Sequence, residues 1–198
     1  DGIRDLVRSR GLGDVYKRQP RISSWREAYR SFGAKPAKFR PSMEAMARRV
    51  LHNQEIPPIN TLVDIGNAVS LRHIIPVGGH AIDVIDGNIF LRKANGDEKF
   101  IPFGSDEVES PLPGEIIFTE GENVLTRRWT WRQANHTLLV KTTSAVEFNI
   151  DGLPPVTIGE VEDACREISE LIERFCGGHA RYEIMTAKNS RISLDDQL

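Results

Sequence analysis

The chain has 198 residues and a formal net charge of −2, with 39% hydrophobic and 27% charged residues. These values are typical of a soluble globular protein with one domain or two small ones. No run is long or apolar enough for a membrane span or a signal peptide, which favours a cytoplasmic protein. Cys165 and Cys176 are the only cysteines. On one helix they would lie about 16 Å apart, too far for a disulfide.

The first nineteen residues differ from the rest of the chain. They are rich in Arg and Gly, lack apolar periodicity, and end in DVYKRQ, which resembles the in-frame translation of a sequencing-library adaptor. We interpret residues 1–19 as a tail foreign to the natural protein and residues 20–198 as a single domain. The alternative is a natural basic arm that binds RNA. The tail has five basic and three acidic residues, so the rest carries −4, and any RNA contact there must be local.

Three helices are predicted in the first third of the chain. Apolar residues recur every three or four positions, and polar residues suited to helix caps, such as Ser23 and Ser24, stand near the start of the first helix. The third helix is apolar on more than one side, which indicates burial. The predicted helices cover about residues 23–33, 42–50 and 60–71.

The middle of the chain changes to short runs of β-branched and aromatic residues, separated by turn pairs such as Asn95-Gly96. A helix over about 159–175 and a last strand over about 180–186 follow. This order predicts an α+β domain with N-terminal helices, a central mixed or antiparallel sheet, one long C-terminal helix and a final strand. The predicted sheet strands are residues 89–92, 99–102, 115–118, 124–127, 137–140 and 146–150.

His80 follows Gly78 and Gly79, which are predicted to form a turn before a strand. Glycines there would let the backbone approach a ligand closely. A histidine at this point could hydrogen-bond a carbonyl or a ribose hydroxyl, or position water. Spacing alone favours the other interpretation, a histidine that satisfies backbone groups at the turn.

Three other polar residues lie near His80 in the sequence. Asp64 and Asn67 share one face of an otherwise apolar helix and need partners there. They brace neighbouring loops or line a site, and spacing favours the brace. Asp83 would face the opposite side of a strand from His80, so the two residues are not an obvious catalytic pair.

A second patch mixes cations with aromatic rings: Arg127, Arg128 and Arg132 surround Trp129 and Trp131. Guanidinium and indole groups stack on bases and contact phosphates, which would suit RNA. The alternative is a sheet edge where the tryptophans pack on the core under the arginine stems. The pattern alone does not choose between them.

Two segments together carry a family resemblance: VDIGNAVSL, then HAID. They resemble the B3/B4 domain of the phenylalanyl-tRNA synthetase β subunit, whose editing site hydrolyses tyrosine wrongly attached to the phenylalanine tRNA. FRPSMEAMARRVL, PPINTLVDIGN, GEIIF and RRWTWRQ are more similar to free-standing B3/B4-domain proteins. The resemblance spans about residues 22–187.

The resemblance implies site residues. His80 matches the family's editing-site histidine and Asn67 its helix asparagine, while Gly66 stands where the synthetase usually has Thr. The synthetase's glycine-rich loop falls near residues 128–132, which lack those glycines, and its later site glutamate falls near Lys141. These departures from the synthetase pattern imply a pocket that is differently shaped and more cationic than the synthetase's.

The function expected first is hydrolysis of misacylated aminoacyl-tRNA. His80 would hold the water, with Asn67, Gly66, Gly78 and Gly79 around the substrate and the arginine-tryptophan patch on the RNA. The alternatives are a non-catalytic binder of aminoacyl-tRNA or of a free amino acid, and a small-molecule ester or amide hydrolase. The expected partner is the 3′ end of tRNA or aminoacyl-tRNA, not DNA or a membrane. No phosphate-loop, dinucleotide or metal-ligand motif is present, so no cofactor or metal is expected.

Overall fold

A computed structural model describes residues 18–194. The predicted helices form, with small shifts at their ends. Gln19, and not a serine, caps the first helix: its side chain accepts a hydrogen bond from the Ile22 amide, and Ser23 and Ser24 lie inside the helix. The serine cap predicted there is therefore wrong. The helices are α2 (Pro20–Ser31), α3 (Ser42–Leu51), α4 (Thr61–His73) and α5 (Ile158–Phe175).

The strands form two antiparallel sheets, so the predicted α+β class is confirmed. The smaller sheet pairs β1 (Val77–Ala81) with β6 (Val146–Ile150). The larger has the order β2-β3-β4-β5. Its strands are Ile89–Lys93, Ile116–Glu120, Asn123–Arg127 and Arg132–Gln133.

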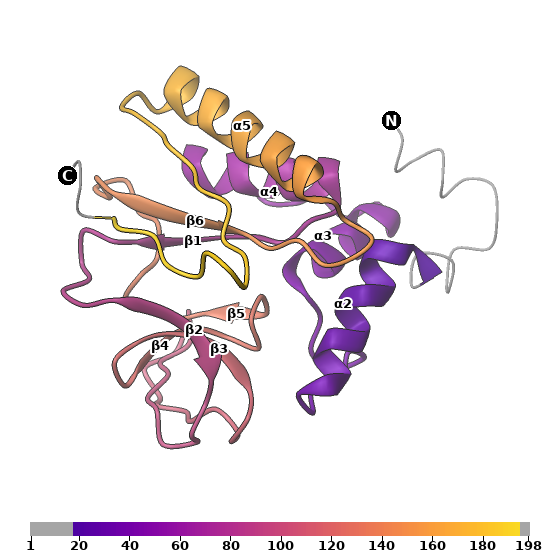
Figure 1. The fold of residues 1–198 in the computed structure, drawn as a ribbon, viewed down its shortest axis with the longest axis vertical. Helices are drawn as coiled ribbons and strands as arrows, with labels where there is room; N and C mark the ends of the chain where they lie inside the picture. The colour runs from indigo at the N-terminus through magenta and orange to yellow at the C-terminus, as the bar shows by residue number, and fades with distance from the viewer. Residues whose placement is uncertain (1–17, 195–198) are drawn as a thin grey trace.

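The elements stack in layers (Figure 1). Helices α4 and α5 cover one side of the β1–β6 pair, and the four-stranded sheet lies on its other side. Ile65, Val69, Ala164 and Ile168 form the core under the helices, with Phe148 packed against them. Helices α2 and α3 stand beside these layers and have a separate core around Trp25, Tyr29 and Met43.

Three predicted strands do not form. Residues 99–102 make only isolated bridges, such as Phe100 to Glu109. Residues 137–140 make scattered hydrogen bonds in place of a ladder: the Thr137 oxygen accepts from the Ala81 amide and from the Gln133 side chain, and the Leu139 oxygen accepts from the Asn60 side chain. Residues 180–186 follow α5 without a ladder partner, and large side chains there are exposed, including Tyr182. Apolar alternation alone does not make a strand when no neighbouring edge is in reach.

Both cysteines are free, as predicted: Cys165 is buried in α5 and Cys176 is exposed just after it. No helix among residues 18–194 is long and apolar enough to cross a bilayer. Nor do these residues contain a group of three or more His, Cys, Asp or Glu side chains placed to hold a metal ion. The proposed foreign tail falls almost wholly outside the described residues.

Candidate functional site

His80 lies between the two sheets and is only 1% exposed. It belongs to β1, so the turn predicted at Gly78 and Gly79 is wrong; both glycines are strand residues. Its Nδ1 is 2.8 Å from a carboxylate oxygen of Glu147, its cross-strand neighbour on β6. Its Nε2 is 2.9 Å from the hydroxyl of Thr126, on β4 of the other sheet. His80 therefore links the two sheets through both ring nitrogens.

The chemistry of these bonds sets the tautomer. A carboxylate only accepts hydrogen bonds, so Nδ1 of His80 carries a hydrogen and donates it to Glu147. In the neutral ring Nε2 then accepts from the Thr126 hydroxyl. A hydroxyl, an imidazole and a carboxylate in this order are the arrangement in which a histidine withdraws a proton from a hydroxyl or from a water. Thr126 and Glu147, on either side of the buried imidazole, are both half-buried.

Strand β6 carries further polar side chains on the face that holds Glu147. Alternate residues of a strand share a face, so Asn149 and Asp151 follow Glu147 toward the four-stranded sheet, while Phe148 turns to the helices. The Asn149 side-chain amide donates to Asp151 over 3.0 Å. Burial raises the pKa of Asp151 to about 6, against opposing hydrogen bonds from Asn149 and Trp129.

Two buried polar atoms beside this face have no hydrogen bond of good geometry. They are the side-chain oxygen of Asn149 and the indole nitrogen of Trp129, although the indole is close enough to help stabilise the Asp151 carboxylate. Buried polar groups are normally satisfied, so such atoms point to a place where a ligand or water supplies the partner. Gly78 lies opposite Asn149, and a Cβ there would come within 2.6 Å of the Asn149 oxygen. The small residue at 78 thus keeps this place open.

Gly66 and Gly79 do not reach the His80 face. Gly79 lies one residue from His80 along β1 and therefore points to the opposite side, where a Cβ would meet Leu139 at 3.0 Å. A Cβ at Gly66 would lie 3.3 Å from Phe148. Gly66 lets α4 pack closely on the β1–β6 pair, and Gly79 leaves room for Leu139 and Phe148. Of the three glycines proposed around the substrate, only Gly78 lies on the same face as His80.

The polar residues of the α4 region have separate roles. Asp64 accepts a hydrogen bond from the Ile59 amide and so braces the loop before the helix. Asp83 accepts from the Ser144 amide and hydroxyl, and the backbone bond holds its pKa below the ordinary value. Asn67 is half-buried, and its side chain makes no hydrogen bond to any of residues 18–194. A substrate contact by Asn67 stays a prediction, whereas Asp83 is a brace.

Arg127 lies inside the protein, 5% exposed. Its guanidinium donates to both carboxylate oxygens of Glu115, at 2.8 and 2.9 Å, and to Glu109 at 2.7 Å. It also lies over the ring of Phe100. A guanidinium held by two carboxylates in this way is fully engaged and is not presented to a phosphate.

The residues after Arg127 attach the N-terminal helices to the sheet. Arg128, 6% exposed, lies 3.7 Å from the centre of the Phe39 ring and 4.4 Å from that of Trp131. Trp129 meets Trp25 of α2 edge to face, with ring centres 4.9 Å apart. Arg128 and Trp129 both adopt positive φ, which turns the chain so that these rings reach the helices. Of the predicted RNA contacts, Arg132 has the most open side chain, at 39% exposure.

Glu147 and Thr126 are the site residues that sequence reasoning missed. One signal was present: polar residues alternate with Phe148 and Ile150 in the last strand. That alternation marks one polar face. It does not show which residue lies opposite His80.

The sequence that forms this fold matches a protein-family model. The model of the B3/4 domain matches residues 24–194, and the chain belongs to this family. Over 78 residues it is 41% identical to the phenylalanine–tRNA ligase β subunit of Lactobacillus johnsonii, and over 76 residues 33% identical to that of Mycoplasma genitalium. Each match covers 38% of this chain and 9% of the relative, so the chain corresponds to a small part of those proteins.

A solved structure is also similar, at a lower sequence identity. It is an N-terminal fragment of the phenylalanyl-tRNA synthetase β subunit from Pyrococcus horikoshii, with 15% identity and a TM-score of 0.47. The match covers 56% of this chain and 38% of that one.

Proposed function

We propose that this protein binds RNA and hydrolyses the ester bond of misacylated aminoacyl-tRNA. Membership of the B3/4 family and the likeness to phenylalanine–tRNA ligase β subunits support an RNA partner. The observation that carries the hydrolytic part is the geometry of His80, held by Glu147 at Nδ1 and facing a hydroxyl at Nε2. The Asn149 side-chain oxygen and the Trp129 indole nitrogen, which lack a hydrogen-bond partner of good geometry, lie on the same side of the strand pair.

The proposed reaction uses His80 as general base. Nε2 takes a proton from a water, directly or through the Thr126 hydroxyl, while Glu147 stabilises the imidazolium that forms. The water oxygen bonds to the carbonyl carbon of the aminoacyl ester. The bond from that carbon to the ribose oxygen then breaks, and the imidazolium returns the proton to the ribose oxygen. The products are a free amino acid and an uncharged tRNA.

The unsatisfied atoms suggest where the amino acid would sit. The Asn149 oxygen accepts hydrogen bonds, so it suits the ammonium group of the substrate, and the nearby Asp151 carboxylate adds negative charge. Gly78 leaves room for this group. Asn67, predicted to orient the amino acid, remains a second candidate for that contact.

Deacylation of a panel of misacylated tRNAs tests this proposal. Wild-type protein should release the amino acid from at least one of them above background. His80→Ala should lower that rate by about 100-fold or more, since general-base catalysis contributes roughly 100- to 10,000-fold. Glu147→Gln, which keeps the shape but loses the charge, should reduce the rate less. The matched control is His179→Ala, an exposed histidine outside the site, which should leave the rate unchanged.

A non-catalytic binder is the second candidate, and one observation favours it. His80 is 1% exposed and both its nitrogens already have partners, as expected of a histidine that holds two sheets together. A binder would shift its melting temperature with a CCA-ended RNA or an amino acid and would hydrolyse none of the panel. His80→Ala would then lower the melting temperature and the affinity together. Turnover by the wild type would refute this second candidate.

A further inference from the structure

Charge is divided unevenly along this chain. Residues 20–54 contain eight Lys and Arg against only Glu27 and Glu44, a net of +6. Residues 55–194 contain thirteen Lys and Arg against twenty-one Asp and Glu, a net of −8. A polyanion is repelled by the second part and attracted by the first. Helices α2 and α3, with the loop between them, therefore form a basic lobe on an acidic body.

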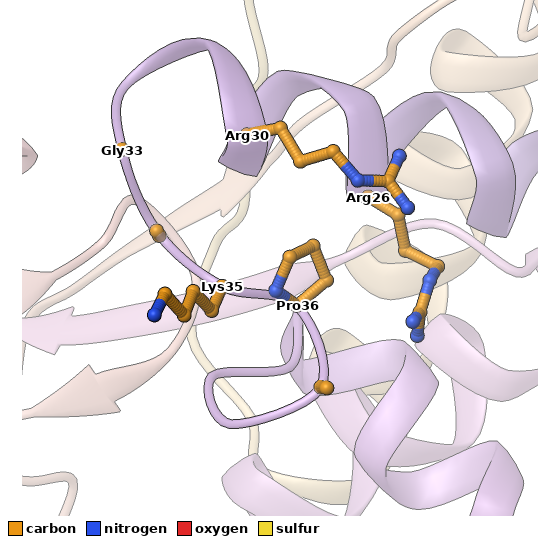
Figure 2. A pocket seen from close by; sticks show the side chains of 7 residues that line it. Arg26, Arg30, Gly33, Lys35 and Pro36 are labelled. Atoms are coloured by element: carbon orange, nitrogen blue, oxygen red, sulfur yellow. The ribbon is translucent and has the colours of Figure 1, made fainter.

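The basic lobe contains a hollow of about 430 Å³ beside the loop after α2. Its lining includes Arg26, Arg30, Lys35 and Pro36. Figure 2 shows Arg26 and Arg30 extending from α2 on one side of Pro36, with Lys35 extending from the loop on the other. Arg26 is engaged by the buried carboxylate of Glu44. Arg30 and Lys35 are exposed at the rim.

A second hollow, of about 560 Å³, lies against α3 and the residues that follow it. Arg40, Arg48, Arg49 and His52 contribute to its lining. Glu44 also lies near Arg40, at 4.0 Å, so the one buried carboxylate offsets charge at both hollows. Most of the positive charge of the lobe stays unpaired. Within the lobe, the charges without an ion pair to any of residues 18–194 are those of Arg30, Lys35, Lys38, Arg48 and Arg49.

We propose that this basic lobe, and not the Arg127–Arg132 segment, is the surface that holds the phosphate backbone of the bound RNA. The inference rests on the proposed function, which supplies RNA as the partner. Arg127 and Arg128 are buried among carboxylates and aromatic rings, whereas the lobe presents unpaired cations around two hollows. Arg128, over the Phe39 ring, and Trp129, against Trp25, fasten the lobe to the sheet that contributes Thr126 to the His80 site. RNA held by the lobe would thus be held by a part of the protein that packs directly on this sheet.

The test compares two variants that lose the same charge. The first is Arg30→Gln/Lys35→Gln/Lys38→Gln, in the lobe. The second is Lys93→Gln/Lys99→Gln/Lys188→Gln, in which all three replaced side chains are exposed and lie outside the lobe. Fluorescence anisotropy with uncharged tRNA is recorded for each full chain across a range of salt concentrations. Circular dichroism melting checks that both variants fold like the wild type.

A plot of log affinity against log salt has a negative slope. Each lost phosphate contact makes that slope less steep by about 0.7–0.9. Three contacts change the slope by about 2–3, which at 0.1 M salt corresponds to roughly 100- to 500-fold weaker binding when affinities are equal near 1 M. We expect this change for the lobe variant, and much less for the matched variant. Equal losses in the two variants would overturn the inference and leave the proposed function standing.

Two further results would contradict the RNA partner as well as this surface. Wild-type protein that binds no tRNA at low salt would refute both the RNA partner and this surface. Binding to phosphatidylserine vesicles with no binding to tRNA would assign the lobe to a membrane surface instead. Deacylation that persists in the lobe variant at saturating tRNA is expected, because the lobe is proposed to hold RNA and not to catalyse.

Discussion

Replacing Arg127 with alanine separates a structural arginine from an RNA-binding one. The change leaves Glu115, 3% exposed, without its bidentate partner and with only Arg128, at 3.3 Å, as an ion pair, and it leaves Glu109 without its shortest ion pair. Removing one partner of a buried ion pair typically costs about 3–5 kcal/mol, because the remaining charge stays desolvated. For a domain of this size each kcal/mol lowers the melting temperature by roughly 2–4 °C, so the total fall should be roughly 6–20 °C.

The assay is thermal unfolding followed by circular dichroism, paired with tRNA anisotropy at a temperature where the variant is still folded. Arg132→Gln is the matched control, because Arg132 is more open and its nearest carboxylate oxygen, on Glu109, is 3.8 Å away. Its melting temperature should move by no more than a degree or two. If Arg127→Ala melted like the wild type and lost RNA affinity, the assignment of Arg127 to the protein interior would be refuted.

Three other perturbations test particular parts of the fold. The pKa of Asp151 is raised in the folded protein, so the native state binds more protons than the unfolded chain between about pH 4 and 6. The free energy of unfolding therefore falls as the pH rises through that window. Asp151→Asn should abolish this fall and be more stable at pH 8 by up to about 3 kcal/mol in urea titrations, whereas parallel pH curves would contradict it. Gly79→Ala should cost about 1–3 kcal/mol, because its Cβ would lie 3.0 Å from Leu139. Gly159→Ala, with open space around it, should cost nothing. Thr157→Ala removes the capping box of α5 and should cost about 1 kcal/mol in the same titration.

Local periodicity was enough to find the helices and most of the strands. The stripe of α5 and the buried pattern of α4 follow from residues within one helix, and the alternation of β6 from residues within one strand. Hydrophobic spacing reports such local facts directly. It does not report which strand pairs with which, so the short apolar runs over residues 99–102 and 137–140 were predicted as strands that do not form.

The site depended on long-range pairing, which one sequence does not reveal. Glu147 is 67 residues from His80, and only the β1–β6 register places them opposite each other. Thr126 reaches His80 from a different sheet. The family resemblance pointed to His80 and could not supply these partners.

The arginine-tryptophan patch misled for a related reason. Its composition suits RNA and suits a packed turn equally well. The outcome depends on Glu115 and Glu109, which the β3–β4 hairpin and the neighbouring loop bring to Arg127. It depends as well on Phe39 and Trp25, which come from the N-terminal helices. Helices α2 and α3, with the loop between them, are where the unpaired positive charge of the lobe lies.

The most direct test of the hydrolytic site is a single-turnover deacylation measurement. Wild-type protein and His80→Ala, each in excess over a misacylated tRNA, are compared at equal occupancy, with tRNA binding measured in parallel. We expect the wild type to release the amino acid and the variant to release it about 100-fold more slowly while still binding the tRNA. Equal rates in the two proteins, or no release by the wild type from any tRNA of the panel, would contradict a hydrolytic site at His80.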